Sequence, residues 1–135
     1  AQTIIAVPGS SNYFKGGIVS YTNEVKENLL HVDHATLEEF TAVSEPVAKQ
    51  MVIGACNALN VDYAIACTGV AGPGGGTPQN PVGTIWIAYG SKDDIRTIKL
   101  TEDEGRDMNI STATCTALRA FLEYYKEKNP QPVEE

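Results

Sequence analysis

The sequence has few basic residues, and they do not form a cluster. It contains 10 Lys and Arg against 17 Asp and Glu, which gives a formal net charge of −7. Proteins that bind nucleic acids neutralise phosphates with grouped lysines and arginines. The composition therefore argues against nucleic acid as a principal partner, although it leaves room for one small anion.

Long hydrophobic runs are also missing, and none approaches the ~20 residues of a membrane-spanning helix. The 42% hydrophobic and 20% charged residues are typical of a soluble globular domain. No signal-peptide pattern opens the sequence, so we expect a cytoplasmic protein with no membrane partner. The 135 residues fit a single domain, which we expect at 1–128, followed by a flexible tail at 129–135.

Cysteine is scarce: Cys56, Cys67 and Cys115 are far apart and lie in apolar stretches. This number and spacing fit neither a disulfide framework nor a zinc site, so we expect three buried, unreactive thiols. His31 and His34 form a lone H-x-x-H without a third ligand at a suggestive spacing. A solvated turn is therefore favoured over a metal site, and we predict neither a metal nor a cofactor.

What the sequence does have is a glycine- and proline-rich stretch, residues 68–83, between two apolar runs. The runs at 61–67 and 84–89 each predict a short buried strand. The loop is longer than neighbouring strands need, and such loops in compact domains are often functional. Its glycines let backbone amides approach a ligand, while its prolines restrict its freedom. A preformed binding surface is favoured, and a turn that only redirects the chain is the alternative.

The remaining patterns predict a layered α/β domain. We expect a helix remnant at 1–7, a strand at 16–21, a helix capped by Thr22 or Asn23, one or two helical turns at 33–40, a helix capped by Ser44, a strand near the sheet edge at 95–100 and a helix at 107–128. This order predicts three α/β/α layers around a mixed sheet. The first helix has no capping residue before it, so we expect the chain to start inside a domain and to lack the start of its first helix.

Apolar residues at helical spacing predict two core-facing stripes. They are Val47, Met51, Val52, Ala55 and Leu59 in the helix after Ser44, and Met108, Cys115, Leu118, Leu122 and Tyr125 in the last helix.

Lys26 falls in or just after the first turn of the helix that Thr22 or Asn23 begins. A cation there faces the positive end of the helix dipole, which disfavours the ammonium form. Such a breach of the usual charge preference is typical of functional sites. A surface lysine whose amine reaches water is the alternative, and the sequence alone leaves both interpretations open.

Several common active-site signatures are absent. Residues 69–77 lack the Gly-Lys-Ser/Thr ending of a P-loop, their glycine order differs from the dinucleotide fingerprint, and no G-x-S-x-G turn occurs. A phosphate still fits the loop, because consecutive backbone amides bind anions without a lysine. Arg106 stands alone after the acidic stretch 101–105, for which a solvated surface is the default interpretation.

Four segments carry a family resemblance: residues 7–17, 21–26, 42–45 and 68–84, which read VPGSSNYFKGG, YTNEVK, AVSE and TGVAGPGGGTPQNPVGT. In this order they resemble the CinA C-terminal domain, the nicotinamide mononucleotide deamidase family, and the resemblance reaches the last helix. It implies a bacterial cytoplasmic amidohydrolase of pyridine nucleotide salvage that converts nicotinamide mononucleotide to nicotinic acid mononucleotide and ammonia. It also implies a serine nucleophile and a lysine base, with no metal.

The resemblance implies roles for individual residues. Lys26 matches the lysine base, and Tyr21 matches a tyrosine that relays or orients the proton. Thr68 matches a threonine or serine position beside the reacting amide. Arg106 matches an arginine before the final helix, where it would bind the phosphate or the carboxamide. The loop glycines expected to line the nucleotide are Gly69, Gly72, Gly74, Gly75 and Gly76.

The chain also departs from the family pattern. The family's nucleophile lies in a Glu-Ser-Cys-Thr-Gly-Gly turn before the first helix, and no serine of this sequence matches it. The resemblance therefore implies that the chain lacks the first strand of the domain, which would carry this turn, and we expect a missing N-terminal segment of the same domain to supply the nucleophile. The family's Gly-Asp-Arg is Glu-Gly-Arg at 104–106, a second arginine is Ser111, and a lysine before Pro81 is Asn80.

Two alternatives to an enzyme stay open. The missing cations favour an inactive domain that binds a nucleotide, and the family's name suggests an interaction domain of a competence- or damage-inducible protein. The number of subunits, including a homo-oligomer, is open as well.

Overall fold

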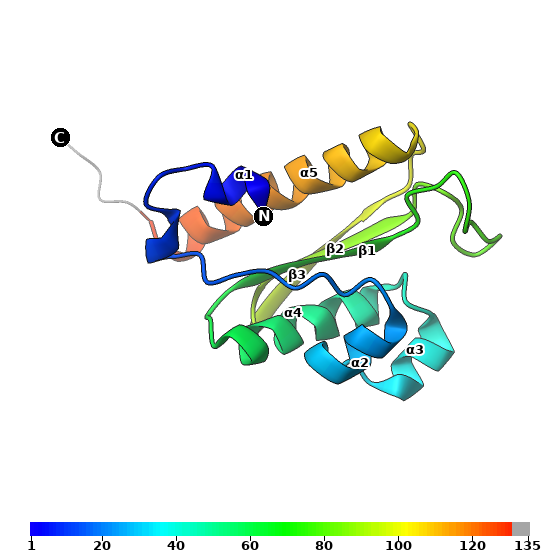
Figure 1. Ribbon diagram of the computed structural model, residues 1–135, viewed down its shortest axis with the longest axis horizontal. Helices are drawn as coiled ribbons and strands as arrows, with labels where there is room; N and C mark the ends of the chain where they lie inside the picture. Colours follow the sequence, from blue (N-terminus) through cyan, green and yellow to red (C-terminus); the bar gives the residue numbers. More distant parts are fainter. Residues whose placement is uncertain (131–135) are drawn as a thin grey trace.

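The computed structural model describes residues 1–130, and Figure 1 labels its elements. They are α1 (Gln2–Ile5), a 3₁₀ helix (Ser10–Asn12), α2 (Asn23–Leu30), α3 (His34–Phe40), α4 (Glu45–Leu59), β1 (Ala64–Gly69), β2 (Ile85–Ser91), β3 (Asp94–Leu100) and α5 (Arg106–Lys128). Of the tail predicted at 129–135, residues 131–135 lie outside the described residues.

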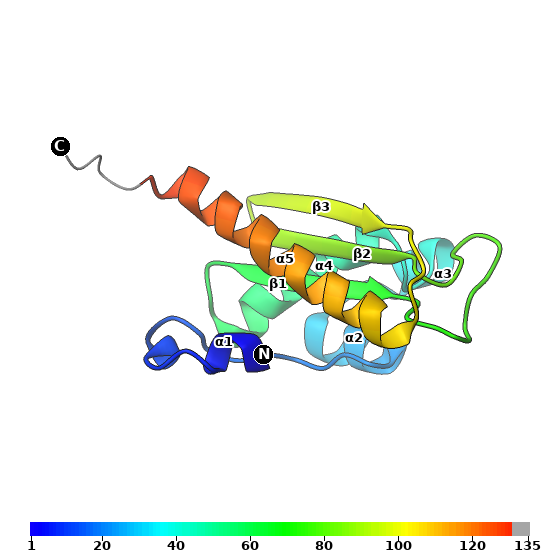
Figure 2. The same ribbon diagram turned by 90° about the horizontal axis from the view of Figure 1, so that it is seen from above.

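A three-stranded sheet separates two helical layers (Figures 1 and 2). Helices α2, α3 and α4 lie on one side of it, and α5 crosses the other. The predicted α/β layers are therefore confirmed. The mixed sheet is not found within residues 1–130, because β1 pairs with β2 and β2 with β3 antiparallel. The loop from β1 to β2 and the turn from β2 to β3 each lead directly to the neighbouring strand, which gives antiparallel pairs.

Residues 16–21 correct the sequence prediction, because they form no strand pairing in the described part of the chain. Burial nevertheless alternates from Phe14 to Tyr21: Phe14, Gly16, Ile18 and Ser20 are half-buried, and the residues between them are exposed. This is the two-residue period of a strand. The sequence carried the alternation, but a ladder also needs a second strand, which residues 1–130 do not provide here.

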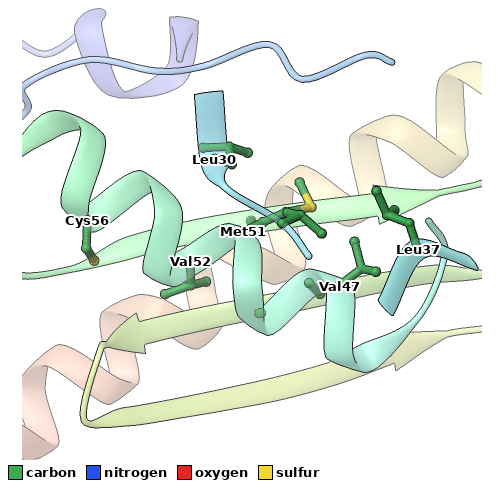
Figure 3. Close-up of a cluster of buried hydrophobic side chains, with 10 residues drawn as sticks. Leu30, Leu37, Val47, Met51, Val52 and Cys56 are labelled. Carbon is green, nitrogen blue, oxygen red and sulfur yellow. The ribbon is translucent and has the colours of Figure 1, made fainter. Parts of the chain in front are cut away.

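Helix α4 builds the larger core. Ser44 is its N-cap and Pro46 lies in its first turn, as predicted. Of the predicted stripe, three residues are fully buried, while Ala55 and Leu59 are half-buried at its margin. Figure 3 shows the cluster labelled there: Leu30, Leu37, Val47, Met51, Val52 and Cys56.

Helices α2 and α4 approach closely at Gly54. A Cβ placed on Gly54 would lie 1.9 Å from the carbonyl oxygen of Leu30, the last residue of α2. Only a residue without a side chain permits this contact. The glycine therefore fixes how near α2 can lie to the core helix.

The face that α5 presents to the sheet is not the predicted one. Its buried residues are Asn109, Ala113, Ala117 and Tyr124. The predicted stripe instead faces outward, with Met108 50%, Leu122 51% and Tyr125 43% exposed, Cys115 exposed and Leu118 half-buried. Ala113 and Ala117 are small and let α5 lie close to β2. The face of α5 that packs on the sheet is therefore the one with small residues, not the most hydrophobic one.

Tyr124 anchors the far end of α5. Its hydroxyl donates to the carbonyl oxygen of Asp94 at 2.9 Å and accepts from the amide of Ser91 at 3.3 Å. Both partners belong to the turn between β2 and β3. A tyrosine can be buried here because its polar atom is satisfied.

Only one of the three cysteines is buried, which corrects the prediction for the other two. Cys56 lies inside α4, while Cys67 and Cys115 are exposed. Cys67 alternates with the buried Ala66 and Thr68 of β1, so it faces the opposite side of the sheet from α4. Apolar neighbours in the sequence do not tell which face of a strand is covered.

The two histidines lie in an exposed turn, as predicted. His31 ends α2 with a left-handed φ of 54°, and His34 begins α3. The Nδ1 atom of His34 lies 2.6 Å from a carboxylate oxygen of Glu27. Across residues 1–130, no group of three His, Cys, Asp or Glu side chains is arranged to hold a metal ion. None of the helices in the same range is both long and apolar enough to cross a membrane.

Candidate functional site

The predicted site residues gather toward one end of the sheet. Both views place α2, α3, the loop between β1 and β2, and the first turn of α5 there (Figures 1 and 2). The strand end, the loop and two helix starts therefore share one region, although the sequence separates them widely.

Lys26 points into the protein from α2. The helix starts where the hydroxyl of Thr22 accepts from the amide of Val25 at 3.2 Å, which makes Lys26 its fourth residue. The lysine is only 7% exposed, and its Nζ donates to the carbonyl oxygen of Ser20 at 2.7 Å. Burial lowers the pKa of Lys26. The surface-lysine interpretation is therefore wrong, and desolvation by burial is the cause of the shift.

Tyr21 lies outside this buried region. Its side chain is 82% exposed, and within residues 1–130 no hydrogen bond joins it to Lys26. It is one residue from Ser20, which accepts the hydrogen bond of Lys26. The side chain of Lys26 is thus buried, whereas the ring of Tyr21, five residues earlier in the sequence, lies at the surface.

Thr68 connects the end of β1 to the start of α4. The residue is buried, and its hydroxyl donates to the carbonyl oxygen of Ala42 at 2.8 Å. The loop reaches the same turn, because Nδ2 of Asn80 donates to the hydroxyl of Thr41 at 3.3 Å. The turn before α4 is therefore held by both the strand and the loop.

The base of the loop extends the ladder of β1 and β2. The amide of Val70 donates to the carbonyl oxygen of Thr84 at 2.9 Å, and the amide of Gly83 donates to the carbonyl oxygen of Val70 at 2.8 Å. Gly83 adopts a positive φ of 96°, and a Cβ there would lie 2.7 Å from the carbonyl oxygen of Glu102. A glycine is required at this crossing of two chain segments.

The tip of the loop leaves amide groups open. Gly69 ends β1, Gly72 is buried, and Gly74, Gly75 and Gly76 are exposed. Within residues 1–130, the amides of Gly72, Gly74, Gly75 and Gly76 donate to no backbone or side-chain acceptor. Free N–H groups in a turn can bind an anion.

Helix α5 holds the inner side of the loop. The Nη1 atom of Arg106 donates to the carbonyl oxygen of Gly72 at 2.8 Å, so these two predicted site residues are in contact. Nδ2 of Asn109 donates to the carbonyl oxygen of Ala71 at 3.0 Å. The sequence analysis missed Asn109. Its signal was an asparagine inside a helix, where that residue is unfavourable without a specific role.

Comparison with known proteins gives the family. A family model described as the CinA C-terminal domain matches residues 1–125. This chain belongs to the CinA C-terminal domain family. The resemblance inferred from the sequence is confirmed.

The relatives of this CinA domain agree. A "CinA-like protein" of Sulfurihydrogenibium sp. (strain YO3AOP1) is 50% identical over 122 residues, which cover 88% of this chain and 30% of the relative. A "CinA-like protein" of Gloeobacter violaceus is 43% identical over 120 residues, covering 87% of this chain and 28% of the relative. The chain thus spans less than a third of the length of these curated relatives.

Solved structures show the same fold. That of the competence-damaged protein (CinA) superfamily protein from Escherichia coli superposes with a TM-score of 0.87 at 31% identity, covering 91% of this chain and 72% of that one. The competence/damage inducible protein from Agrobacterium tumefaciens gives a TM-score of 0.81 at 35% identity, covering 88% and 73%. The α/β architecture of this CinA domain is therefore that of its superfamily.

The arrangement suits two chemical tasks. A buried amine with a lowered pKa has more neutral form available, and that form can accept a proton. A loop with open amides, next to the guanidinium of Arg106, can hold an anionic group. In this CinA domain both features lie toward the same end of the sheet (Figure 1).

Proposed function

We propose that this CinA domain is part of an amidohydrolase that converts nicotinamide mononucleotide and water to nicotinic acid mononucleotide and ammonia. The observation that carries the proposal is the buried Lys26, whose pKa is lowered by burial and which belongs to α2, a helix at the loop end of the sheet. Family membership supports it, since the resemblance implies a lysine base. The proposed enzyme acts in the cytoplasm and uses no metal or cofactor.

In the proposed reaction the neutral amine of Lys26 takes the proton of a serine hydroxyl as the serine oxygen attacks the carboxamide carbon. The carbon–nitrogen bond then breaks, and the leaving nitrogen takes the proton from the lysine ammonium and departs as ammonia. Water next attacks the resulting ester, which yields the carboxylate product and restores the serine. The serine comes from polypeptide before Ala1, since no serine of this sequence matches the family's nucleophile turn.

The other candidate residues would bind and orient the nucleotide. The amides of the exposed Gly74, Gly75 and Gly76, together with that of the buried Gly72, would receive the phosphate, and Arg106 would add a charged donor beside them. Thr68 would lie next to the reacting amide, and Tyr21 would orient the transferred proton. Gly69 allows the end of β1 to lie close to Ile85 of β2, because a Cβ there would lie 2.6 Å from the Cγ1 atom of Ile85.

A second function is favoured by two positions where the chain lacks a cation. The side chain of Asn80 is bound to Thr41, and Ser111 lies exposed on α5. With fewer cations near the loop, a domain that binds a nucleotide without hydrolysing it is the competing proposal. Calorimetry separates the two, since this alternative requires nucleotide binding with no release of ammonia from the full-length protein.

The experiment that tests the enzyme measures ammonia release from nicotinamide mononucleotide by the full-length protein. Lys26→Ala and Lys26→Met are expected to lower kcat by about 10²–10⁴-fold, the usual contribution of a general base. Lys49→Ala is the matched control, because Lys49 lies on α4 with its side chain 44% exposed.

Unchanged turnover in both Lys26 variants would remove Lys26 from the mechanism. Circular dichroism of each variant shows whether a loss reflects chemistry or unfolding. An interaction role predicts instead that capture of a protein partner survives Lys26→Ala, while the parent releases no ammonia.

A further inference from the structure

Asn109 is a buried polar residue in an exposed part of the chain. It is 3% exposed, although its neighbours from residue 101 to 108 are all exposed. Its Nδ2 atom donates to the carbonyl oxygen of Ala71 and to the Oδ1 atom of Asp103, each at 3.0 Å. Its Oδ1 atom accepts from the amide of Glu104 at 2.9 Å. The side-chain amide is therefore fully engaged.

These partners fix the orientation of the Asn109 amide. Ala71 offers only a carbonyl oxygen and Asp103 a carboxylate, and both can only accept, whereas the backbone amide of Glu104 can only donate. In the opposite orientation the Oδ1 atom of Asn109 would face the oxygens of Ala71 and Asp103, and its Nδ2 atom would face the backbone nitrogen of Glu104. Asparagine is thus one of few side chains with the donors and the acceptor that this position needs.

The contacts of Asn109 join three parts of the candidate site. They connect the loop after β1, the acidic turn before α5, and α5 itself, which are separated by up to 38 residues in the sequence. Arg106, one turn earlier on the same helix, holds the next carbonyl of the loop, that of Gly72. Two consecutive loop carbonyls are therefore bound to one helix, and the glycines that follow Pro73, residues 74–76, are exposed.

We propose that Asn109 is a positioning residue that holds the glycine loop against α5, so that the loop amides stay open to the phosphate of the nucleotide. The ligand in this statement rests on the proposed function. Asn109 matters more than Arg106 for this task, because Arg106 is exposed and water can replace its bond. Loss of the Asn109 amide removes the partners of the Ala71 carbonyl and the Glu104 amide; Glu104 is exposed, so the cost falls mainly on the carbonyl of the half-buried Ala71.

The test uses Asn109→Ala and Asn109→Asp in the full-length protein. The aspartate keeps an oxygen for the Glu104 amide but places oxygen against the Ala71 carbonyl and the Asp103 carboxylate. Tyr124→Phe is the control, because it removes buried hydrogen bonds from the same helix at its other end.

Three experiments are run: hydrogen exchange of the loop amides at Val70, Thr77 and Gly83, calorimetry for the Kd of nicotinamide mononucleotide, and ammonia-release kinetics for kcat and KM. Both Asn109 variants are expected to exchange these amides about tenfold faster and to raise Kd and KM about tenfold, with kcat changed much less. Tyr124→Phe is expected to leave all of these near the parent values.

Loop exchange that is unchanged in Asn109→Asp, or that rises equally in Tyr124→Phe, would overturn the proposal. Exchange that rises over the whole chain in both Asn109 variants would also overturn it, since Asn109 would then support only global stability. If the parent releases no ammonia, the proposed hydrolase fails, while hydrogen exchange and Kd still decide the role of Asn109.

Discussion

Replacing Gly54 by alanine tests how closely α2 must lie against α4. The new Cβ would lie 1.9, 2.6 and 2.8 Å from the O, C and Cα atoms of Leu30, whereas real Cβ atoms essentially never approach within 3.0 Å. All three are backbone atoms, so no side-chain rotation relieves the overlap and α2 has to move by about 1 Å. Such overpacking costs about 1–3 kcal/mol, and this contact belongs at the upper end.

Alanine also favours the helix over glycine by about 1 kcal/mol, so we expect a net loss of about 2 kcal/mol. For a domain of this size that lowers Tm by about 8 °C. The displaced helix carries Lys26, and a shift of ~1 Å in a catalytic group can reduce turnover ~10²-fold. Thermal unfolding followed by circular dichroism measures the first effect and ammonia release by the full-length protein the second.

Gly17→Ala is the matched control, because a Cβ on Gly17 would meet nothing within 4 Å. Its Tm should equal that of the parent protein. The reasoning is refuted if Gly54→Ala keeps the parent Tm, or if Gly17→Ala loses as much.

Two substitutions test the buried polar groups. Lys26→Met should raise Tm near pH 7, because the folded state lowers the pKa of Lys26 from 10.5. Between the folded and unfolded pKa values the parent takes up a proton when it unfolds, so its stability rises with pH. The difference in Tm between the variant and the parent should therefore shrink as the pH approaches 10.5. Thermal melts over that range check this, and a difference independent of pH would contradict it. Tyr124→Phe should cost about 1–2 kcal/mol in urea denaturation, because the Ser91 amide and the Asp94 carbonyl lose their partner; an unchanged free energy of unfolding would show that water replaces the hydroxyl.

Local signals in the sequence predicted most of the elements. Ser44 followed by Pro46 located the start of α4, because capping and first-turn preferences depend on adjacent residues. The apolar runs beside the glycine loop became β1 and β2, since each is short and bounded by turn residues. The same local reasoning selected Lys26 as unusual, although the burial that lowers its pKa was not predicted.

Features that depend on distant contacts were not predictable. Helix α5 carries two apolar stripes, and only the sheet decides that Ala113 and Ala117 face inward while Leu122 stays 51% exposed. The role of Asn109 rests on Ala71, 38 residues away. Hydrophobic periodicity and residue propensity describe neighbouring residues only, so they do not predict a contact between residues so far apart in the sequence.

The extended segment before α2 has a consequence for the behaviour of this chain in solution. Among the described residues, none donates to or accepts from the backbone of residues 15–19, and Val19 is 87% exposed. An open strand edge of this kind recruits any extended backbone that comes near it. The backbone of residues 15–19 is therefore available to pair with another extended segment, including the N-terminal polypeptide proposed above.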